Sequence, residues 1–215
     1  MGLDRIQDAP EGAAAAESRR RTLTELLEEI KRISAGVITK QALCEILTGA
    51  LLDRKELAPY EHWLPDRHTR NLIYRNERIE LMLICWPAGV TTPLHTHNGQ
   101  LGWMAMVSGR LKVENFRLVQ CDHPENQEVV GIDCLSGATS ITMEQLSTEI
   151  CEPGGALNTV DKHQTIHRIV NPPEWNEPAM SLHIYSMPID SCVVFDLDQQ
   201  KCWRRDLGYD NDGRD

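Results

Sequence analysis

The sequence predicts a mainly β protein, an antiparallel barrel or jelly roll preceded by α-helices. Between residues 71 and 205, short apolar or alternating runs are separated by turn residues. Many short strands at such spacing are typical of barrels and jelly rolls. Before residue 57, apolar residues instead recur every three or four positions, which is the period of an amphipathic helix.

Two α-helices are predicted ahead of the barrel. The first begins after Thr22, because Thr22 and Glu25 have the spacing of a capping box, and it ends at Gly36. The second follows Thr39. Each has an apolar face that could dock a partner, but we expect both faces to pack against the protein's own sheet. These faces comprise Leu23, Leu26, Leu27, Ile30 and Ile33 in the first helix and Leu43, Ile46, Leu47 and Leu51 in the second.

Seven segments have the length and composition of strands. They are Ile79–Trp86, Gly102–Val107, Leu111–Phe116, Thr139–Met143, His167–Val170, Met180–Ser186 and Cys192–Asp196. Little regular pattern is found in residues 117–138 and 144–166. The chain is therefore divided into four parts: a disordered leader over 1–21, a helical segment packed on the barrel over 22–57, the barrel over 58–205, and a disordered tail over 206–215.

The composition argues against several classes of protein. A net charge of -10 disfavours nucleic acid or an anionic membrane as a partner. No apolar run approaches the roughly 20 residues of a membrane span, and no signal-peptide pattern is present. The seven cysteines lack a CxxC pair, which disfavours a disulfide scaffold or a zinc–thiolate cluster. We predict a cytoplasmic protein, and a monomer because no apolar stripe is left over.

The pair His95-x-His97 and the distant His167 predict a metal site. Side chains two apart in an extended strand point to the same face, so two imidazoles can converge on one ion and a third can join from a neighbouring strand. His163 is the alternative third ligand, but it lies in a polar stretch, whereas His167 opens an apolar run. Three neutral ligands leave a divalent metal its full charge and open positions for an anionic, chelating substrate.

A stripe of polar residues lies further along the chain. Ser181, His183 and Tyr185 are spaced two apart, so they share one face of a strand. A histidine between a hydroxyl and a phenol can relay a hydrogen bond, but the stripe taken alone is more typical of a solvated face. Leu182 and Ile184 make the opposite face apolar, and the pattern does not say which face lines the barrel.

Several of these segments resemble motifs of known families. The run from Gly89 through His95 and His97 to Gly109 has the spacing of the first cupin motif, and His167 to Asn171 resembles the end of the second. Over about residues 58–200, the order of motifs is similar to that in cysteine dioxygenases. The matching segments are Arg70-Asn-Leu, Leu81–Trp86, the two histidine motifs, Ser181–Ser186, Pro188–Cys192 and Phe195-Asp196.

This resemblance implies a cupin jelly roll with a defined chemistry. It implies ferrous iron, Fe(2+), held by His95, His97 and His167. It also implies Arg70 as the anchor for the substrate carboxylate and a relay of Ser181, His183 and Tyr185, with Tyr185 reaching the substrate. The implied reaction oxidises a thiol, L-cysteine, to a sulfinic acid with both atoms of dioxygen. The residues suit this, because imidazole-bound iron keeps positions for thiolate and dioxygen, and guanidinium binds carboxylate bidentately.

The sequence departs from the animal members of that family at two places. Gly102 stands where they carry a cysteine that becomes linked to the active-site tyrosine, so no such crosslink to Tyr185 can form here. Many other cupins place a metal-binding glutamate at this position, so three protein ligands are expected. The turn Ser186-Met187-Pro188 has one proline where animal members have two, which makes a cis bond there less favourable.

The remaining histidines and Trp86 are predicted to lie outside the metal site. Trp86 is expected to be core packing. His62, His68 and His123 are expected to be peripheral, although His68 is close enough to Arg70 in sequence to border a pocket.

Three alternative functions stay open. A 3-mercaptopropionate dioxygenase would use the same chemistry, but that group usually has glutamine in place of Arg70. A non-catalytic metal-binding cupin module would not need the polar relay. A zinc or manganese cupin, such as an isomerase, would work without dioxygen and would usually have the carboxylate ligand that Gly102 cannot supply.

Overall fold

The computed structural model describes residues 19–48, 50–121, 137–138, 140–160 and 166–211. Two helices precede the barrel, as predicted: α1 (Leu23–Ala35) and α2 (Lys40–Leu47). The short α3 (Arg54–Leu57) was not predicted, and Leu51, expected on the second helix, lies in the strand β2 (Ala50–Leu51) because α2 ends at Leu47. Thr22 caps α1 in a complete capping box with Glu25, and the Thr39 side chain caps α2. No helix in the described part of the chain is long and apolar enough to cross a membrane.

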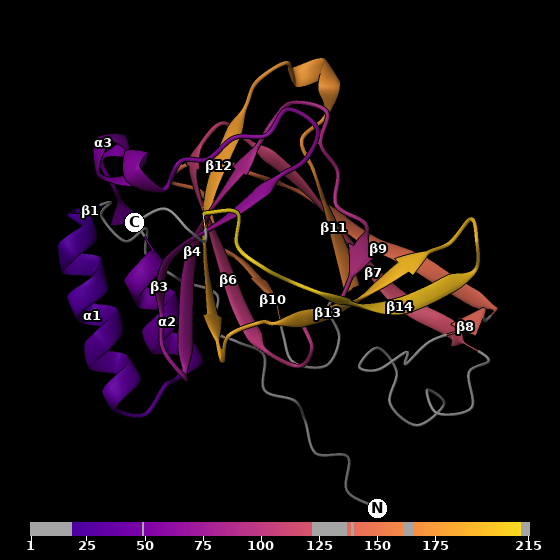
Figure 1. Ribbon diagram of the computed structural model, residues 1–215, viewed down its shortest axis with the longest axis horizontal. Coiled ribbons are helices and arrows are strands. Elements are labelled where there is room, and N and C mark those ends of the chain that lie inside the picture. The colour runs from indigo at the N-terminus through magenta and orange to yellow at the C-terminus, as the bar shows by residue number, and fades with distance from the viewer. Residues whose placement is uncertain (1–18, 49, 122–136, 139, 161–165, 212–215) are drawn as a thin grey trace, which may run out of the picture.

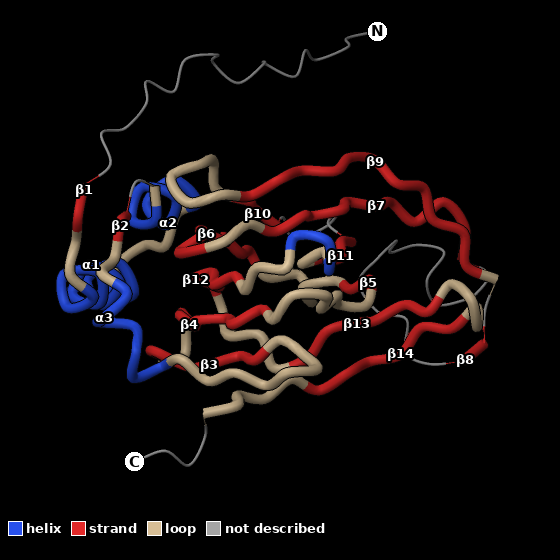
Figure 2. Tube along the Cα trace, turned by 90° about the horizontal axis from the view of Figure 1, so that it is seen from above, coloured by secondary structure: helices blue, strands red, loops and turns tan. Residues whose placement is uncertain are grey.

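The strands form two large antiparallel sheets that face each other, with a small parallel pair beside the helices (Figures 1 and 2). The five-stranded sheet has the order β10-β6-β12-β4-β3, and the seven-stranded sheet has the order β8-β14-β13-β5-β11-β7-β9. The parallel pair is β1 (Arg19–Arg20) with β2 (Ala50–Leu51). This confirms the predicted mainly β, cupin-like fold with N-terminal helices.

Five strands of the large sheets agree closely with predicted segments: β4 (Ile79–Trp86), β6 (Leu101–Ser108), β11 (Ile166–Val170), β12 (Ala179–Ser186) and β13 (Ser191–Asp196). Two extend well beyond the prediction: β7 (Leu111–Cys121) and β9 (Ile141–Cys151). Five had no predicted counterpart: β3 (Thr69–Arg75), β5 (Leu94–His95), β8 (Gly137–Ala138), β10 (Asn158–Val160) and β14 (Lys201–Asp206). Most of β9 is exposed on both faces, so it lacks the apolar alternation by which strands are recognised.

Strand β4 is buried along its whole length because both of its faces are covered. Leu81, Leu83 and Cys85 pack in the cluster that contains the apolar residues of α1 and α2. Met82 and Ile84, on the opposite face, belong to a second cluster between the sheets. The helices therefore cover the outer face of the five-stranded sheet, as Figure 1 shows, and the other face looks into the barrel.

The same alternation decides the orientation of β12. Leu182 and Ile184 pack in the helix-side cluster. Because alternate side chains point to opposite faces, Ser181, His183 and Tyr185 point into the barrel, and all three are buried. The reading of this stripe as a solvated face is thereby excluded.

The turn after β12 has an unusual backbone conformation. Met187 has a φ of +69°, in the left-handed region that non-glycine residues rarely adopt. Its amide donates to the carbonyl of Arg78 at 2.8 Å, which fixes the turn against the start of β4. The peptide bonds of this turn are trans, since the described residues contain no cis bond.

The prediction of a disordered C-terminal tail is wrong for residues 206–211. Asp206 ends β14, and the Leu207 amide donates to the Asp190 carbonyl at 2.9 Å. The Arg70 amide donates to the Asp210 carboxylate at 2.7 Å, and Asn211 binds both backbone groups of Leu72. The segment is held by backbone groups along β3, which side-chain periodicity does not reveal. Residues 212–215 lie outside the described residues.

At the other end, residues 1–18 of the predicted leader also lie outside the described residues. Arg19 and Arg20 form β1 rather than a disordered segment, and the Arg21 side chain forms an ion pair with Glu29 of α1.

The cysteines also differ from expectation at one position. Cys44, Cys85, Cys151 and Cys192 are free thiols, but Cys202 in β14 is disulfide-bonded. Burial raises the pKa of the Cys85, Cys151 and Cys192 thiols to about 11, so these thiols are protonated and weakly reactive near neutral pH.

We predict that Ile30→Ala destabilises the protein by about 2–5 kcal/mol, because Ile30 is fully buried between the helices and the sheet. Urea unfolding would measure the change. Val37→Ala is the control, since Val37 is 84% exposed, and it should change stability by less than about 0.5 kcal/mol. Equal effects of the two substitutions would show that the helices do not dock on the sheet as described.

Candidate metal centre

Two strands of the seven-stranded sheet bring three histidines together. His95 is the last residue of β5, and its direct cross-strand partner on β11 is His167. His97 follows two residues after His95, so its ring turns to the same side. One ring nitrogen from each of the three lies within 4.8 Å of the others. Metal–nitrogen distances near 2 Å require only small side-chain adjustments from this arrangement.

The environment of the rings fits a metal ion. Both ring nitrogens of His167 are buried and have no hydrogen-bond partner among the described residues. An unpaired buried polar atom is costly, so His167 indicates a ligand that the protein itself does not provide. His95 donates from Nδ1 to the carbonyl of Pro93 at 2.9 Å, which leaves Nε2 with its lone pair free for a metal.

Burial keeps the imidazoles of His95 and His167 neutral. It lowers the pKa of His95 and lowers the pKa of His167 well below its usual value, and for His167 the neighbouring His97 and His95 add to the effect. Neutral imidazole is the form that binds metal. The alternative ligand His163, like His123, lies outside the described residues.

A chain of hydrogen bonds runs beside the three histidines. The Trp86 indole donates to Ser181 Oγ at 2.8 Å, Ser181 Oγ lies 2.8 Å from His183 Nε2, and His183 Nδ1 lies 3.4 Å from the Tyr185 hydroxyl. The Tyr185 ring stacks beside His97, with centroids 6.0 Å apart. The structure thus brings the predicted stripe to the three-histidine cluster.

Two members of this environment were not assigned a role from sequence. Trp86 is buried, as predicted for core packing, but it also begins the hydrogen-bond chain through Ser181. His68 stacks on Trp86 with centroids 4.9 Å apart and lines the same cavity. Burial lowers the pKa of His68 to about 4. A tryptophan at the end of an apolar strand carries no sequence signal of this second role.

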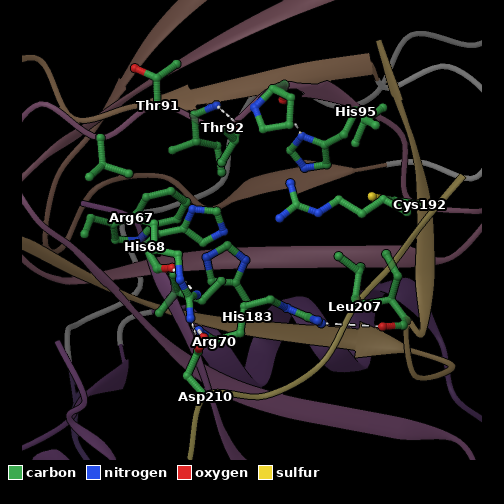
Figure 3. Close-up of a pocket in the computed structure, with 18 of the residues that line it drawn as sticks. Arg67, His68, Arg70, Thr91, Thr92, His95, His183, Cys192, Leu207 and Asp210 are labelled. Atoms are coloured by element: carbon green, nitrogen blue, oxygen red, sulfur yellow. Dashed lines mark hydrogen bonds and ion pairs between the residues drawn. The ribbon is translucent and has the colours of Figure 1, made fainter. Parts of the chain in front are cut away.

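Arg70 lies at the edge of the same cavity (Figure 3). Its guanidinium donates to the Gly208 carbonyl at 3.0 Å, to Glu80 at 3.3 Å and to the Ile189 carbonyl at 3.4 Å. Glu80 is completely buried. Burial raises the pKa of Glu80, and hydrogen bonding from Tyr209 and the charges of Arg70 and Arg75 oppose that rise.

The cavity has a volume of about 740 Å³ and includes all three histidines. His183, Tyr185 and Arg70 also line it, so it joins the predicted ligands, relay and carboxylate anchor. Figure 3 shows His95, His183, Arg70, Cys192 and Leu207 around this space. The C-terminal residues Leu207 to Asp210 form part of the wall, which the sequence did not indicate.

Gly102 lies directly opposite Tyr185 on the neighbouring strand β6. A Cβ atom there would lie 2.6 Å from Tyr185 Cε1 and 2.6 Å from Val160 Cγ2. The absence of a side chain therefore lets the tyrosine ring pack against the β6 backbone, and no metal ligand can come from this position.

A barrel of two antiparallel sheets that brings three histidines side by side defines a metal-binding protein of the cupin type. A family model for cysteine dioxygenase type I matches residues 12–198. The chain therefore belongs to the cysteine dioxygenase type I family, a family of thiol dioxygenases.

Individual relatives agree with this assignment. Cysteine dioxygenase type 1 from Homo sapiens is 29% identical over 178 residues, which cover 82% of this chain and 80% of the relative. The protein of the same name from Danio rerio is 28% identical over 180 residues, covering 81% and 79%. Among solved structures, a cupin superfamily protein from Desulfitobacterium hafniense DCB-2 covers 61% of this chain and 88% of that one at 12% identity. Its TM-score of 0.39 is too low to support a conclusion.

We predict that His167→Ala abolishes stoichiometric metal binding, because it removes the one ligand that β11 supplies to the cluster. Metal content after anaerobic reconstitution and desalting should fall at least tenfold. His62→Ala is the control, since His62 does not line the cavity, and it should retain full metal content. Retention of metal by the His167 variant would exclude the three-histidine site.

Proposed function

We propose that the protein is an iron-dependent dioxygenase that converts L-cysteine and dioxygen to cysteine sulfinic acid. The observation that supports this most directly is the grouping of His95, His97 and His167 with Arg70 and Tyr185 around one cavity. The reaction balances without a further reductant: both atoms of dioxygen are added to sulfur, which loses the four electrons that dioxygen gains, and the thiol proton is released. We also expect a cytoplasmic monomer.

Ferrous iron is the metal proposed for the three histidines. When bound, it would supply open coordination positions for a thiolate and dioxygen and the electron density that activates dioxygen. An imidazole binds a metal in its neutral form, so three such ligands would leave the full double charge of the ion to attract an anionic substrate and to favour the thiolate over the thiol.

The carboxylate of the substrate would be bound by Arg70. This guanidinium donates three hydrogen bonds to the protein, and a guanidinium has five N–H groups, so donors remain for a ligand. The contacts with Glu80 and the two carbonyls hold the side chain in one orientation, and a preorganised donor loses less entropy on binding.

The buried chain from Trp86 would orient the Tyr185 hydroxyl. The indole N–H is a donor only, so Ser181 Oγ accepts a hydrogen bond from it. The Ser181 hydroxyl can then donate a hydrogen bond to His183 Nε2. His183 would then carry its proton on Nδ1 and donate to the tyrosine oxygen. In this arrangement the Tyr185 O–H is left to donate into the cavity.

Burial sets the protonation states that this role requires. It lowers the pKa of His183 to about 3, helped by the charge of Arg70, so the imidazole stays neutral. It raises the pKa of Tyr185 above the usual value of a phenol. The phenol is therefore a hydrogen-bond donor near neutral pH, suited to hold the substrate and the oxygen atoms being added to sulfur.

Dioxygen uptake by protein reconstituted anaerobically with ferrous iron tests the proposal. Uptake with L-cysteine, matched by an equal amount of cysteine sulfinate, is the expected result. Preference for 3-mercaptopropionate would keep the chemistry and change the substrate. No uptake with either thiol by protein that contains iron would favour a non-catalytic metal-binding module.

We predict that Tyr185→Phe lowers kcat for thiol oxidation about 100-fold, because it removes the hydroxyl that faces the reacting atoms. Metal content should be unchanged, since Tyr185 is not among the three ligands. Tyr60→Phe is the matched control, because Tyr60 packs on the helix side and does not line the cavity. Steady-state dioxygen consumption would measure both variants, and an unchanged kcat in Tyr185→Phe would rule out the relay.

A further inference from the structure

A second arginine, Arg205, lines the cavity together with Arg70. Arg70 comes from β3 of the five-stranded sheet, whereas Arg205 comes from β14 of the seven-stranded sheet. Both line the cavity that holds the three histidines. The two arginines therefore line one cavity from different sheets.

The strand register places Arg205 within reach of a ligand at the metal centre. Arg205 is the direct cross-strand partner of Cys192 on β13, and Val194, two residues further on, is the partner of His95. Neighbouring strands lie about 5 Å apart and alternate residues about 7 Å apart. The backbone of Arg205 is thus about 12 Å from that of His95, a gap that a long arginine side chain and a small ligand can span.

Arg205 differs from the other arginines of the cavity because its side chain has no acceptor among the residues that the structure describes. Arg70 binds Glu80 and two carbonyls, and Arg67 forms an ion pair with Asp210. No hydrogen bond or ion pair between described residues involves the Arg205 side chain, although the carboxylates of Asp66, Asp206 and Asp210 also line the cavity. All of its donors are therefore available for an anionic group of a ligand.

The size of the cavity also favours a ligand with more than one anionic group. At about 740 Å³, it lies in the upper part of the range for small-molecule sites. L-cysteine, which carries one carboxylate, would fill only a small part of this volume and would leave one of the two arginines without an anionic partner.

We propose that the cavity accepts thiols with two carboxylate groups, one bound by Arg70 and the second by Arg205. This inference rests on the proposed thiol dioxygenase activity and names a wider substrate class for the same site. Arg205 is then a specificity-determining residue, because its guanidinium contacts a group that L-cysteine lacks.

Turnover of two matched thiols tests this inference. 2-Mercaptosuccinate differs from 3-mercaptopropionate by one added carboxylate. In Arg205→Gln, kcat/KM should fall about tenfold or more for 2-mercaptosuccinate, the loss of a charge-assisted hydrogen bond, and less than twofold for 3-mercaptopropionate. Arg205→Lys should restore part of the loss. Lys201→Ala is the control, because Lys201 is on the same strand and does not line the cavity.

Binding to the metal-free protein provides a readout that does not depend on dioxygen chemistry. Succinate differs from propionate by one carboxylate and has no thiol. Calorimetry should show that succinate binds wild-type protein at least tenfold more tightly than propionate, and that Arg205→Gln removes this difference. The preference should persist in Lys201→Ala.

The outcomes separate the two proposals. A succinate preference that depends on Arg205, without dioxygen uptake with any thiol, would support the dicarboxylate site and reject the dioxygenase activity. Uptake with L-cysteine, combined with equal binding of succinate and propionate, would reject the dicarboxylate site alone. Equal losses for both thiols in Arg205→Gln would also reject it, since Arg205 would then serve a carboxylate that both share.

Discussion

The burial of both faces of the central strands β4 and β12 is the constraint on which the rest of the structure depends. Strands alternate their side chains between two faces, so each must satisfy two environments at once. The helices cover one face with leucine and isoleucine, and the barrel interior receives the other. Leu182 and Ile184 pack under the helices, so the polar residues that alternate with them face the barrel interior.

Turning a polar stripe inward is costly unless its hydrogen bonds are satisfied. The structure meets this condition by linking Trp86, Ser181, His183 and Tyr185 in one chain. Trp86 contributes to the apolar core with its ring and to the polar chain with its N–H. These hydrogen bonds offset the cost of burying the polar stripe, and they also fix the direction in which the Tyr185 hydroxyl can donate.

Some charged groups around the cavity are paired within the protein, whereas the Arg205 side chain has no partner among the described residues. Glu80 is buried and compensated by Arg70, Arg75 and Tyr209, which anchors the C-terminal segment to β3 and fixes the position of Arg70. His95, His167 and His183 are held neutral by burial. The side chain of Arg205, which lines the same cavity, has no hydrogen bond or ion pair to another described residue.

The sequence by itself determined the fold class, the helix starts at Thr22 and Thr39, and the three histidines of the metal centre. These features depend on local spacing: capping hydrogen bonds, the period of strands, and alternate residues of one strand that share a face. Strand β3 at the edge of its sheet, strand β14 and the C-terminal segment were not found, because backbone pairing leaves no mark in side-chain periodicity.

The tertiary structure decided which face of β12 lines the barrel, what Trp86 does beyond packing, and which arginines meet in one cavity. Arg70 and Arg205 are far apart in the sequence and come from different sheets. Their proximity follows from how the two sheets close on each other, a long-range arrangement that no local pattern of residues specifies.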